Sequence, residues 1–150
     1  MRLFLDTNIA LDFMLTREPY FRAARKLMLC GFLQELELWI SGAQVNDMFY
    51  ILTEGGKTSY NEASKQALQK LRQCVSVYPL GEQEIDATLN SNWPDLEDAC
   101  LYQAALRIKA DFIITRNPTD FVFSTIKTLT AEQVFDYIRE HQGITYDELS

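Results

Sequence analysis

The chain has 150 residues, of which 47% are apolar, a length that suits one domain with its own core and is too short for two. Its net charge of −7 at pH 7 counts against a protein that holds nucleic acid on a broad basic surface. A small acidic site that meets phosphates through bridging cations remains open, as does a basic partner protein. No apolar stretch approaches the roughly 20 residues of a membrane span, so we expect no membrane segment.

The amino terminus and the cysteines indicate a cytoplasmic protein. Only three apolar residues separate Arg2 from Asp6, which leaves no room for the apolar segment of a signal peptide. Cys30, Cys74 and Cys100 are odd in number, far apart and each beside apolar residues. We interpret them as small buried side chains in a reducing compartment, rather than as a disulfide framework or a zinc site.

Short apolar runs alternate along the chain with longer amphipathic segments, a pattern typical of a parallel α/β sheet. Val45, Met48 and Leu52 recur at helical spacing, and Gly31 and Gly55-Gly56 are expected to end helices. The elements predicted for the first half of the chain are a strand at 2–6, helices at 8–15 and 20–31, a strand at 36–41, and helices at 44–53 and 60–74.

The same alternation continues through the second half of the chain. Thr130 is expected to cap the last helix, and the absence of a linker or repeat indicates one domain. The predicted elements are a strand at 75–80, helices at 81–90 and 95–109, a strand at 111–115, a fifth strand at 124–129, a helix at 130–140 and a polar tail at 143–150.

Acidic residues placed after apolar segments are the most informative feature of the chain. Crowded carboxylates raise one another's pKa and destabilise their ionised forms. A hard cation such as Mg²⁺ or Mn²⁺ removes that penalty and prefers oxygen ligands, so the pattern predicts a metal site that acts on something anionic. The acidic residues concerned are Asp6, Asp47, Asp95 with Asp98, and Asp120.

Polar residues end three of the predicted strands, namely Asp6, Ser41 and Thr115. Ligands of open parallel sheets bind outside the carboxyl ends of the strands, so we expect these side chains and the acids to share one edge. Asn117 lies in the loop after the strand at 111–115. Arg116, beside the acids, is the best candidate for a phosphate contact.

The first two acids also have structural interpretations. Asp6 could start a turn, with Asn8 as the cap of the following helix. Asp47 could be a solvated position on the outer face of its helix.

The later acids have structural alternatives too. Asp95 after Pro94 is a natural helix cap, which we favour for it, and Asp98 could form a capping-box-like pair with it. The segment 117–120 is a good turn sequence in its own right. We favour a shared site because so many coincidences at one edge are less probable than one common cause.

Four segments resemble the motifs of PIN domains, in the right order over nearly the whole chain. The nearest in pattern are the small bacterial PIN proteins that include VapC-type toxins. The resemblance implies a three-layer α/β/α sandwich at 1–142, with a central parallel sheet of four to five strands, and a C-terminal tail at 143–150. The motifs are Leu5-Asp6-Thr7-Asn8, Ile40-Ser41 through Asp47, Asp95-Leu96-Glu97-Asp98-Ala99 and Thr115-Arg116-Asn117-Pro118-Thr119-Asp120-Phe121.

The resemblance also implies a function, cleavage of RNA phosphodiester bonds by four acids around Mg²⁺ or Mn²⁺. Asp6 and Asp98 are expected as the main ligands, with Asp47 and Asp120 as outer or shared ligands and Asp95 beside them. Thr7, Asn8, Ser41 and Thr115 are expected to orient the carboxylates or the phosphate, with Arg116 and Asn117 near the phosphate. One departure is that the helix acid is more often Glu in the toxins, whereas Asp47 is shorter.

Two hypotheses follow from the sequence. The first is a metal-dependent ribonuclease, as the toxin of a toxin–antitoxin pair, with RNA, a small antitoxin protein and a second copy of the chain as partners. The second is a PIN-like module that binds nucleic acid or a partner without cutting. Retention of all four acids favours the enzyme, whereas Asp47 and the net charge of −7 favour the binding module.

Overall fold

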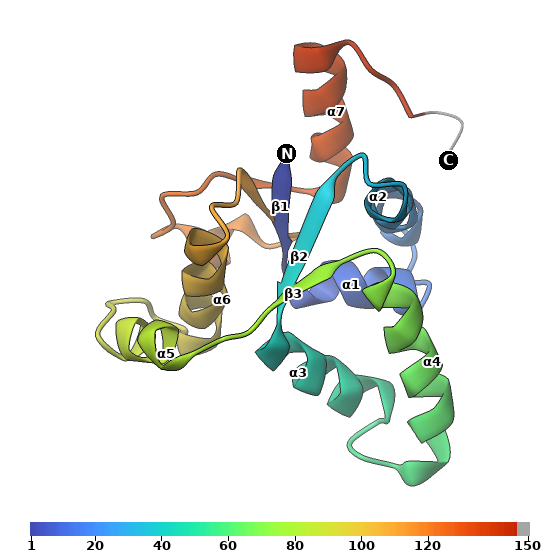
Figure 1. Ribbon diagram of the computed structural model, residues 1–150, viewed down its shortest axis with the longest axis vertical. Helices are drawn as coiled ribbons and strands as arrows, with labels where there is room; N and C mark the ends of the chain where they lie inside the picture. The colour runs from blue at the N-terminus through green and yellow to red at the C-terminus, as the bar shows by residue number, and fades with distance from the viewer. Residues whose placement is uncertain (147–150) are drawn as a thin grey trace.

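The computed structural model describes residues 1–146 and contains a five-stranded parallel sheet with helices on both faces (Figure 1). The strand order is β3-β2-β1-β4-β5, and every neighbouring pair is parallel. The predicted α/β/α architecture is confirmed, with five strands. They are β1 (Arg2–Leu5), β2 (Glu37–Ser41), β3 (Ser76–Tyr78), β4 (Phe112–Ile114) and β5 (Thr128–Leu129).

The helices fall where the sequence pattern places them, with ends that differ by a few residues, as helix termini commonly do. Two short 3₁₀ turns, η1 (Thr58–Tyr60) and η2 (Pro118–Phe121), accompany them. The α-helices are α1 (Thr7–Met14), α2 (Phe21–Phe32), α3 (Gly42–Leu52), α4 (Asn61–Arg72), α5 (Glu82–Leu89), α6 (Leu96–Arg107) and α7 (Ala131–Gln142).

The fifth strand is shorter than predicted, because only Thr128 and Leu129 pair with β4. Upstream of it, the Ser124 hydroxyl donates to the carbonyl of Ile126 at 2.7 Å and accepts from its amide at 2.9 Å. A serine that satisfies nearby backbone groups competes with sheet pairing. Residues 124–127 therefore form a local turn instead of extending the strand.

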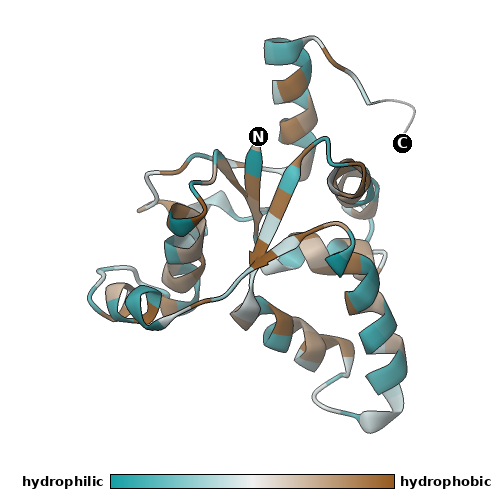
Figure 2. Cartoon of the chain, in the orientation of Figure 1, coloured by the Kyte–Doolittle hydropathy of each residue, from teal (hydrophilic) through white to brown (hydrophobic). Residues whose placement is uncertain are grey.

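The hydrophobic core lies on both faces of the sheet, because successive strand residues point to opposite sides. Leu3 and Leu5 of β1 pack with residues of α1, α2, α4 and α7. Phe4, between them, packs with Ile113 and with α6 on the other face. Figure 2 shows that hydrophilic residues dominate α4, whereas β1 carries hydrophobic residues beyond its first position. Helices thus cover both faces and leave the carboxyl edge of the sheet for the polar residues.

Gly31 lies inside α2 and does not end the helix, so its predicted role as a stop signal is wrong. A Cβ at this position would lie 2.4 Å from the carbonyl oxygen of Cys74 and 2.6 Å from Cδ1 of Leu38. The glycine is needed because α2 approaches β2 and the start of β3 so closely. The chain turns after α2 at Gln34, whose φ is 62°.

We expect Gly31→Ala to destabilise the fold by about 1–3 kcal/mol, because a backbone oxygen cannot move aside as a flexible side chain can. The free energy of urea unfolding measures the effect. Gly42→Ala is the matched control, since the nearest atom to its added Cβ is 3.8 Å away. Equal stability of both variants would show that α2 can shift without cost.

The predicted tail begins where α7 ends, at Gly143 in a left-handed conformation with φ 67°. The ring of Tyr146 packs against Phe135 of α7, with ring centroids 6.0 Å apart. Positions 147–150 of the predicted tail lie outside the described residues. Within residues 1–146, no helix has both the length and the apolar character that crossing a membrane requires.

The three cysteines are unpaired, as expected. Cys30 is buried as predicted, and burial raises the pKa of its thiol to about 11. Cys74 and Cys100 are only half-buried.

A candidate acidic site at the carboxyl edge of the sheet

The carboxyl ends of β1, β2 and β4 meet at one edge of the sheet, as predicted. Leu5 pairs with Ile114 in register, so Asp6 and Thr115, which follow them, are neighbours across the two strands. Ser41 ends β2 on the other side of β1. In Figure 1 this edge lies at the lower end of β1 and β2, where α1 and α3 begin.

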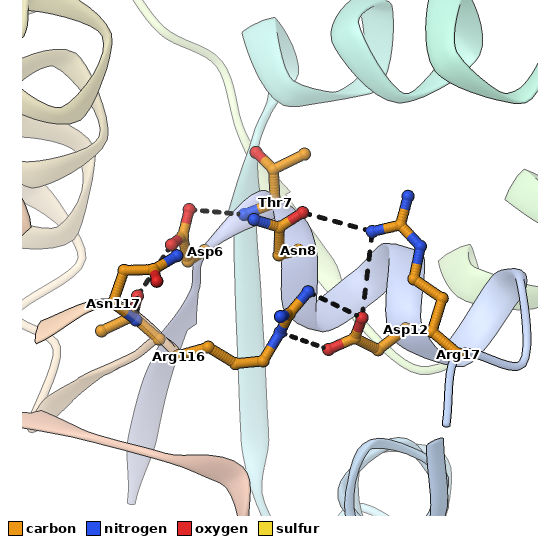
Figure 3. Close-up of polar contacts among 8 residues, drawn as sticks. Asp6, Thr7, Asn8, Asp12, Arg17, Arg116 and Asn117 are labelled. Atoms are coloured by element: carbon orange, nitrogen blue, oxygen red, sulfur yellow. Dashed lines mark hydrogen bonds and ion pairs between the residues drawn. The ribbon is translucent and has the colours of Figure 1, made fainter. Parts of the chain in front are cut away.

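The carboxylate of Asp6 is held in a fixed orientation by two hydrogen bonds (Figure 3). The Thr7 amide donates to Oδ1 and the Thr115 hydroxyl donates to Oδ2, both at 2.8 Å. Thr115 is itself held, because its hydroxyl accepts the Asn117 amide at 3.0 Å. Asp6 is also the N-cap of α1, so Asn8 is not the cap. Burial raises the pKa of Asp6, the two hydrogen bonds oppose that shift, and the charge of Asp120 adds to it.

The acids at the start of α6 divide into a cap and a partly buried carboxyl. Asp95 is the N-cap, as favoured from the sequence, because its Oδ1 accepts the Asp98 amide at 3.1 Å. Partial burial and the charges of Asp95, Asp120 and Asp6 raise the pKa of Asp98 to about 7. The predicted acids of β1, α6 and η2 therefore lie near enough for their charges to act on Asp98, and their sharing of one site stays a prediction.

Asp47 is exposed on α3 and faces a residue that sequence reasoning did not assign, Glu97 of α6. Partial burial is the largest cause that raises the pKa of Glu97. The charges of Asp47 and Asp95 and a hydrogen bond with Asp47 raise this pKa further. Glu97 stands inside a motif used to identify the family, next to Asp98. Its contact with Asp47 depends on how closely α3 and α6 pack. A local sequence pattern does not predict that packing.

Asp12 is the second acid that sequence reasoning missed, and it is fully buried in α1. Arg116 meets it with Nε 2.9 Å from Oδ2 and with an Nη2 hydrogen bond to Oδ1 at 3.1 Å (Figure 3). The guanidinium also lies over the ring of Tyr20, 3.9 Å from its centroid. Burial raises the pKa of Asp12, and the charges of Arg116 and Arg17 oppose that shift. The predicted phosphate contact of Arg116 stays a prediction, and the residue also has this structural contact.

The remaining predicted polar residues have different partners. Gln44 of α3 joins the two strand ends, since its Oε1 accepts the Ser41 amide at 2.7 Å and its Nε2 donates to the Leu5 carbonyl at 2.8 Å. The same Nε2 donates to the Thr7 hydroxyl at 3.2 Å. Asn8 accepts from Arg17 at 3.3 Å. The buried hydroxyl of Ser41 has no hydrogen-bond partner among residues 1–146.

The donor set is composed of oxygen atoms, which suits Mg²⁺ or Mn²⁺ rather than zinc. Across residues 1–146, no three His, Cys, Asp or Glu side chains are already close enough to share a metal ion. The raised pKa values of Asp6 and Asp98 reflect a cost that a cation would remove. The residues therefore fit the ion by their chemistry and by the edge they share, and their role as ligands stays a prediction.

A mostly apolar cavity of about 250 Å³ borders this edge. Its lining includes the acids Asp47 and Glu97 and the apolar side chains of Ile85, Leu89 and Leu96. A larger cavity of about 670 Å³ lies at the opposite edge of the sheet, beside the first residues of β1 and β2, away from the acids.

The sequence profile of the PIN domain matches residues 2–119 of the chain. This range contains β1 through β4 and all the predicted acids but Asp120, which follows its last residue. A comparison with curated protein sequences gave no match.

Similar solved structures include bacterial toxin–antitoxin proteins. A toxin–antitoxin complex from Klebsiella pneumoniae has 19% identity and TM-score 0.60, covering 86% of this chain and 97% of that one. VapBC-1 from nontypeable Haemophilus influenzae has 20% identity and TM-score 0.61, with coverage of 88% and 99%. VapC20 from Mycobacterium tuberculosis, a sarcin–ricin loop cleaving toxin, has 11% identity and TM-score 0.55, with coverage of 74% and 86%. At these identities the similarity shows the fold alone.

Proposed function

The chain belongs to the PIN domain family, and from this we propose that it is a Mg²⁺- or Mn²⁺-dependent endoribonuclease that hydrolyses RNA phosphodiester bonds. Members of the family are typically metal-dependent nucleases. One observation supports the proposal: burial raises the pKa of Asp98 to about 7, and the charges of Asp95, Asp120 and Asp6 add to that shift. A carboxyl whose pKa is strongly raised by burial and by neighbouring charges is a candidate for a functional site.

Asp6 and Asp98 would be the main ligands of the ion, with Asp120, Asp47 and Asp95 as outer or shared ligands. A bound divalent ion supplies a water of lowered pKa and stabilises charge on the phosphate. The Thr115 hydroxyl and the Thr7 amide hold both oxygens of Asp6 in place. The carboxylate would therefore need no reorientation when the ion binds.

The partly protonated Asp98 would lose its proton on binding the ion, because a cation favours the ionised carboxylate. Binding of the ion would therefore release a proton near neutral pH.

We also propose that the protein is the toxin of a toxin–antitoxin pair, with a small antitoxin as partner. The support is the likeness of fold to the Klebsiella pneumoniae complex and to VapBC-1 of Haemophilus influenzae. Coexpression with the product of a short neighbouring reading frame should yield a copurifying complex that does not cut RNA. A homodimer stays a prediction, which the mass of the purified protein in solution would test.

A PIN-like binding module is the second candidate function, and one observation favours it. Asp47 is exposed and shorter than the Glu that is commoner at this position, and it contacts Glu97. A site with one weak ligand could bind nucleic acid through a cation without cutting it. The two functions differ in whether RNA is cleaved.

Metal binding is the first expected result. Mg²⁺ or Mn²⁺ should raise the melting temperature, because a ligand that binds only the native state stabilises it by mass action. Asp6→Asn should weaken that rise, whereas Asp136→Asn, at an exposed position of α7, should leave it intact. Calorimetry that detects no divalent-ion binding at millimolar concentration would refute the metal site.

Cleavage of single-stranded RNA by the purified protein tests the enzyme itself. We expect Mn²⁺-dependent cutting that EDTA stops and Asp6→Ala abolishes, with Asp136→Ala as the charge-matched control. Protein that binds RNA with metal but cuts no member of a varied substrate panel would be the binding module. Cutting that persists in EDTA or in Asp6→Ala would come from a contaminant and leave the enzyme unsupported.

A further inference from the structure

Two arginine side chains meet on the buried carboxylate of Asp12. Arg116 contacts both of its oxygens, at 2.9 and 3.1 Å. Arg17, in the turn that follows α1, lies with Nη1 3.9 Å from Oδ1 of Asp12 and donates to Oδ1 of Asn8 at 3.3 Å. Figure 3 shows dashed contacts to Asp12 from both guanidinium groups, that of Arg116 on its left and that of Arg17 above it. We call Arg17 and Arg116 the arginine pair.

The arginine pair carries more positive charge than Asp12 neutralises. The carboxylate of Asp12 is the one in contact with both guanidinium groups, and Asn8 adds no charge, whereas the charge of Arg116 also acts on Asp6 and that of Glu132 on Asp12. The side chain of Asp12 is 1% exposed, whereas those of Arg17 and Arg116 are 33% and 24% exposed. The negative charge is therefore hidden beneath two positive groups that a ligand can reach, in a chain whose net charge is −7.

The guanidinium of Arg116 is held in place before any ligand arrives. Asp12 holds its Nε and Nη2 groups, and the Tyr20 ring lies against its face at 3.9 Å. Arginine restrained in this way loses little conformational freedom on binding an anion. Arg17 is less restrained, because its contact with Asp12 is long.

The arginine pair lies beside the acidic site. Arg116 directly follows Thr115, whose hydroxyl holds Asp6, and Asn8, the partner of Arg17, is two residues after Asp6 in α1. Figure 3 shows Asp6, Asn8 and Arg116 in one view, with the arginine pair on the side of α1. An RNA strand placed on the acids would bring its next phosphates to the border of the acidic edge, where the arginine pair lies.

We propose that the arginine pair, anchored on Asp12, binds an RNA phosphate next to the one that is hydrolysed. The proposal rests on the proposed ribonuclease function. Guanidinium groups bind phosphate oxygens through paired hydrogen bonds. Such a contact fixes the position of the RNA strand and also balances the charge of the phosphate. Asp12 is then a positioning residue, because it touches Arg116 and not the RNA.

Inorganic pyrophosphate in EDTA tests the arginine pair without requiring any nuclease activity. It should raise the melting temperature of the wild-type protein and of Arg139→Ala, a control with the same charge change at an exposed position of α7. Arg17→Ala should lose most of this rise and Arg17→Lys should keep part of it. Arg17 makes only long or single contacts, so its variants should fold. A rise in Arg17→Ala equal to that of Arg139→Ala would overturn the proposal.

Kinetics of RNA cleavage form the second arm. Arg17→Ala should raise KM about tenfold with little change in kcat and should make binding less dependent on salt, because one phosphate contact is lost. Unchanged KM in an active enzyme would overturn the proposal. If the wild type binds pyrophosphate through the arginine pair but never cuts RNA, the proposed function fails and the anion site stands.

Discussion

Replacing Arg116 with alanine is expected to destabilise the protein by about 3–5 kcal/mol, the cost of breaking a buried ion pair on one side. The variant would leave Asp12 buried, with Arg17 as its nearest cation at 3.9 Å. Arg116→Lys should lose less, because a lysine keeps the charge but not the paired contact. The free energy of urea unfolding at pH 7 measures both.

Two comparisons separate this effect from a general loss of charge. Arg139→Ala removes a side chain that is 57% exposed, and exposed pairs of this kind contribute 0–1 kcal/mol at most, so we expect about that change. The double variant Asp12→Leu with Arg116→Met removes both charges and should recover much of the lost stability. An Arg116→Ala variant as stable as the wild type would contradict the buried ion pair.

Asp98→Asn is expected to lower the rate of RNA cleavage by about 10²–10³-fold or more. This is the size of effect that follows removal of one preorganised group from an active site. The loss in activity should come without loss of fold, since Asp95 caps α6 by accepting the backbone amide of residue 98, which asparagine keeps. A strongly destabilised variant would instead mark Asp98 as a structural residue.

The stability of the metal-free protein should change in the opposite direction to its activity. The pKa of Asp98 is about 7 in the fold and about 3.9 in the unfolded chain, so protonation favours the fold. This contribution is complete below about pH 4 and is lost as pH rises through about 7. Asp98→Asn does not titrate, so it should match the wild type at pH 4 and exceed it by on the order of 1 kcal/mol at pH 8, given solvent screening. Unfolding in EDTA at both pH values checks the sign.

Much of the candidate site could be predicted from the sequence, because its position follows from topology. The apolar run at Leu3, Phe4 and Leu5 identifies a buried strand, and parallel strands bring Asp6 and Thr115 to one edge. The Asp95 cap is visible in the order of residues after Pro94.

The contacts of Asp12 and Gly31 could not be predicted in this way. The Asp12–Arg116 pair joins positions 104 residues apart, and only the final arrangement of α1 against the end of β4 creates it. The position of Asp12 between Leu11 and Phe13 indicates a buried charge, but the sequence does not predict which residue pairs with it. Gly31 carries the usual signal of a helix end, whereas its role depends on the distance between α2 and Cys74.

The pairing of β1 with β4 has a consequence for synthesis of the chain. Asp6 receives its hydrogen bond from Thr115 and Asp12 its ion pair from Arg116, and both partners are made more than a hundred residues later. Domains complete such distant contacts only after the later segment has left the ribosome. A growing chain therefore lacks these contacts of Asp6 and Asp12 until Thr115 and Arg116 have emerged. For an enzyme that cuts RNA, this order of assembly would protect the messenger that is being translated.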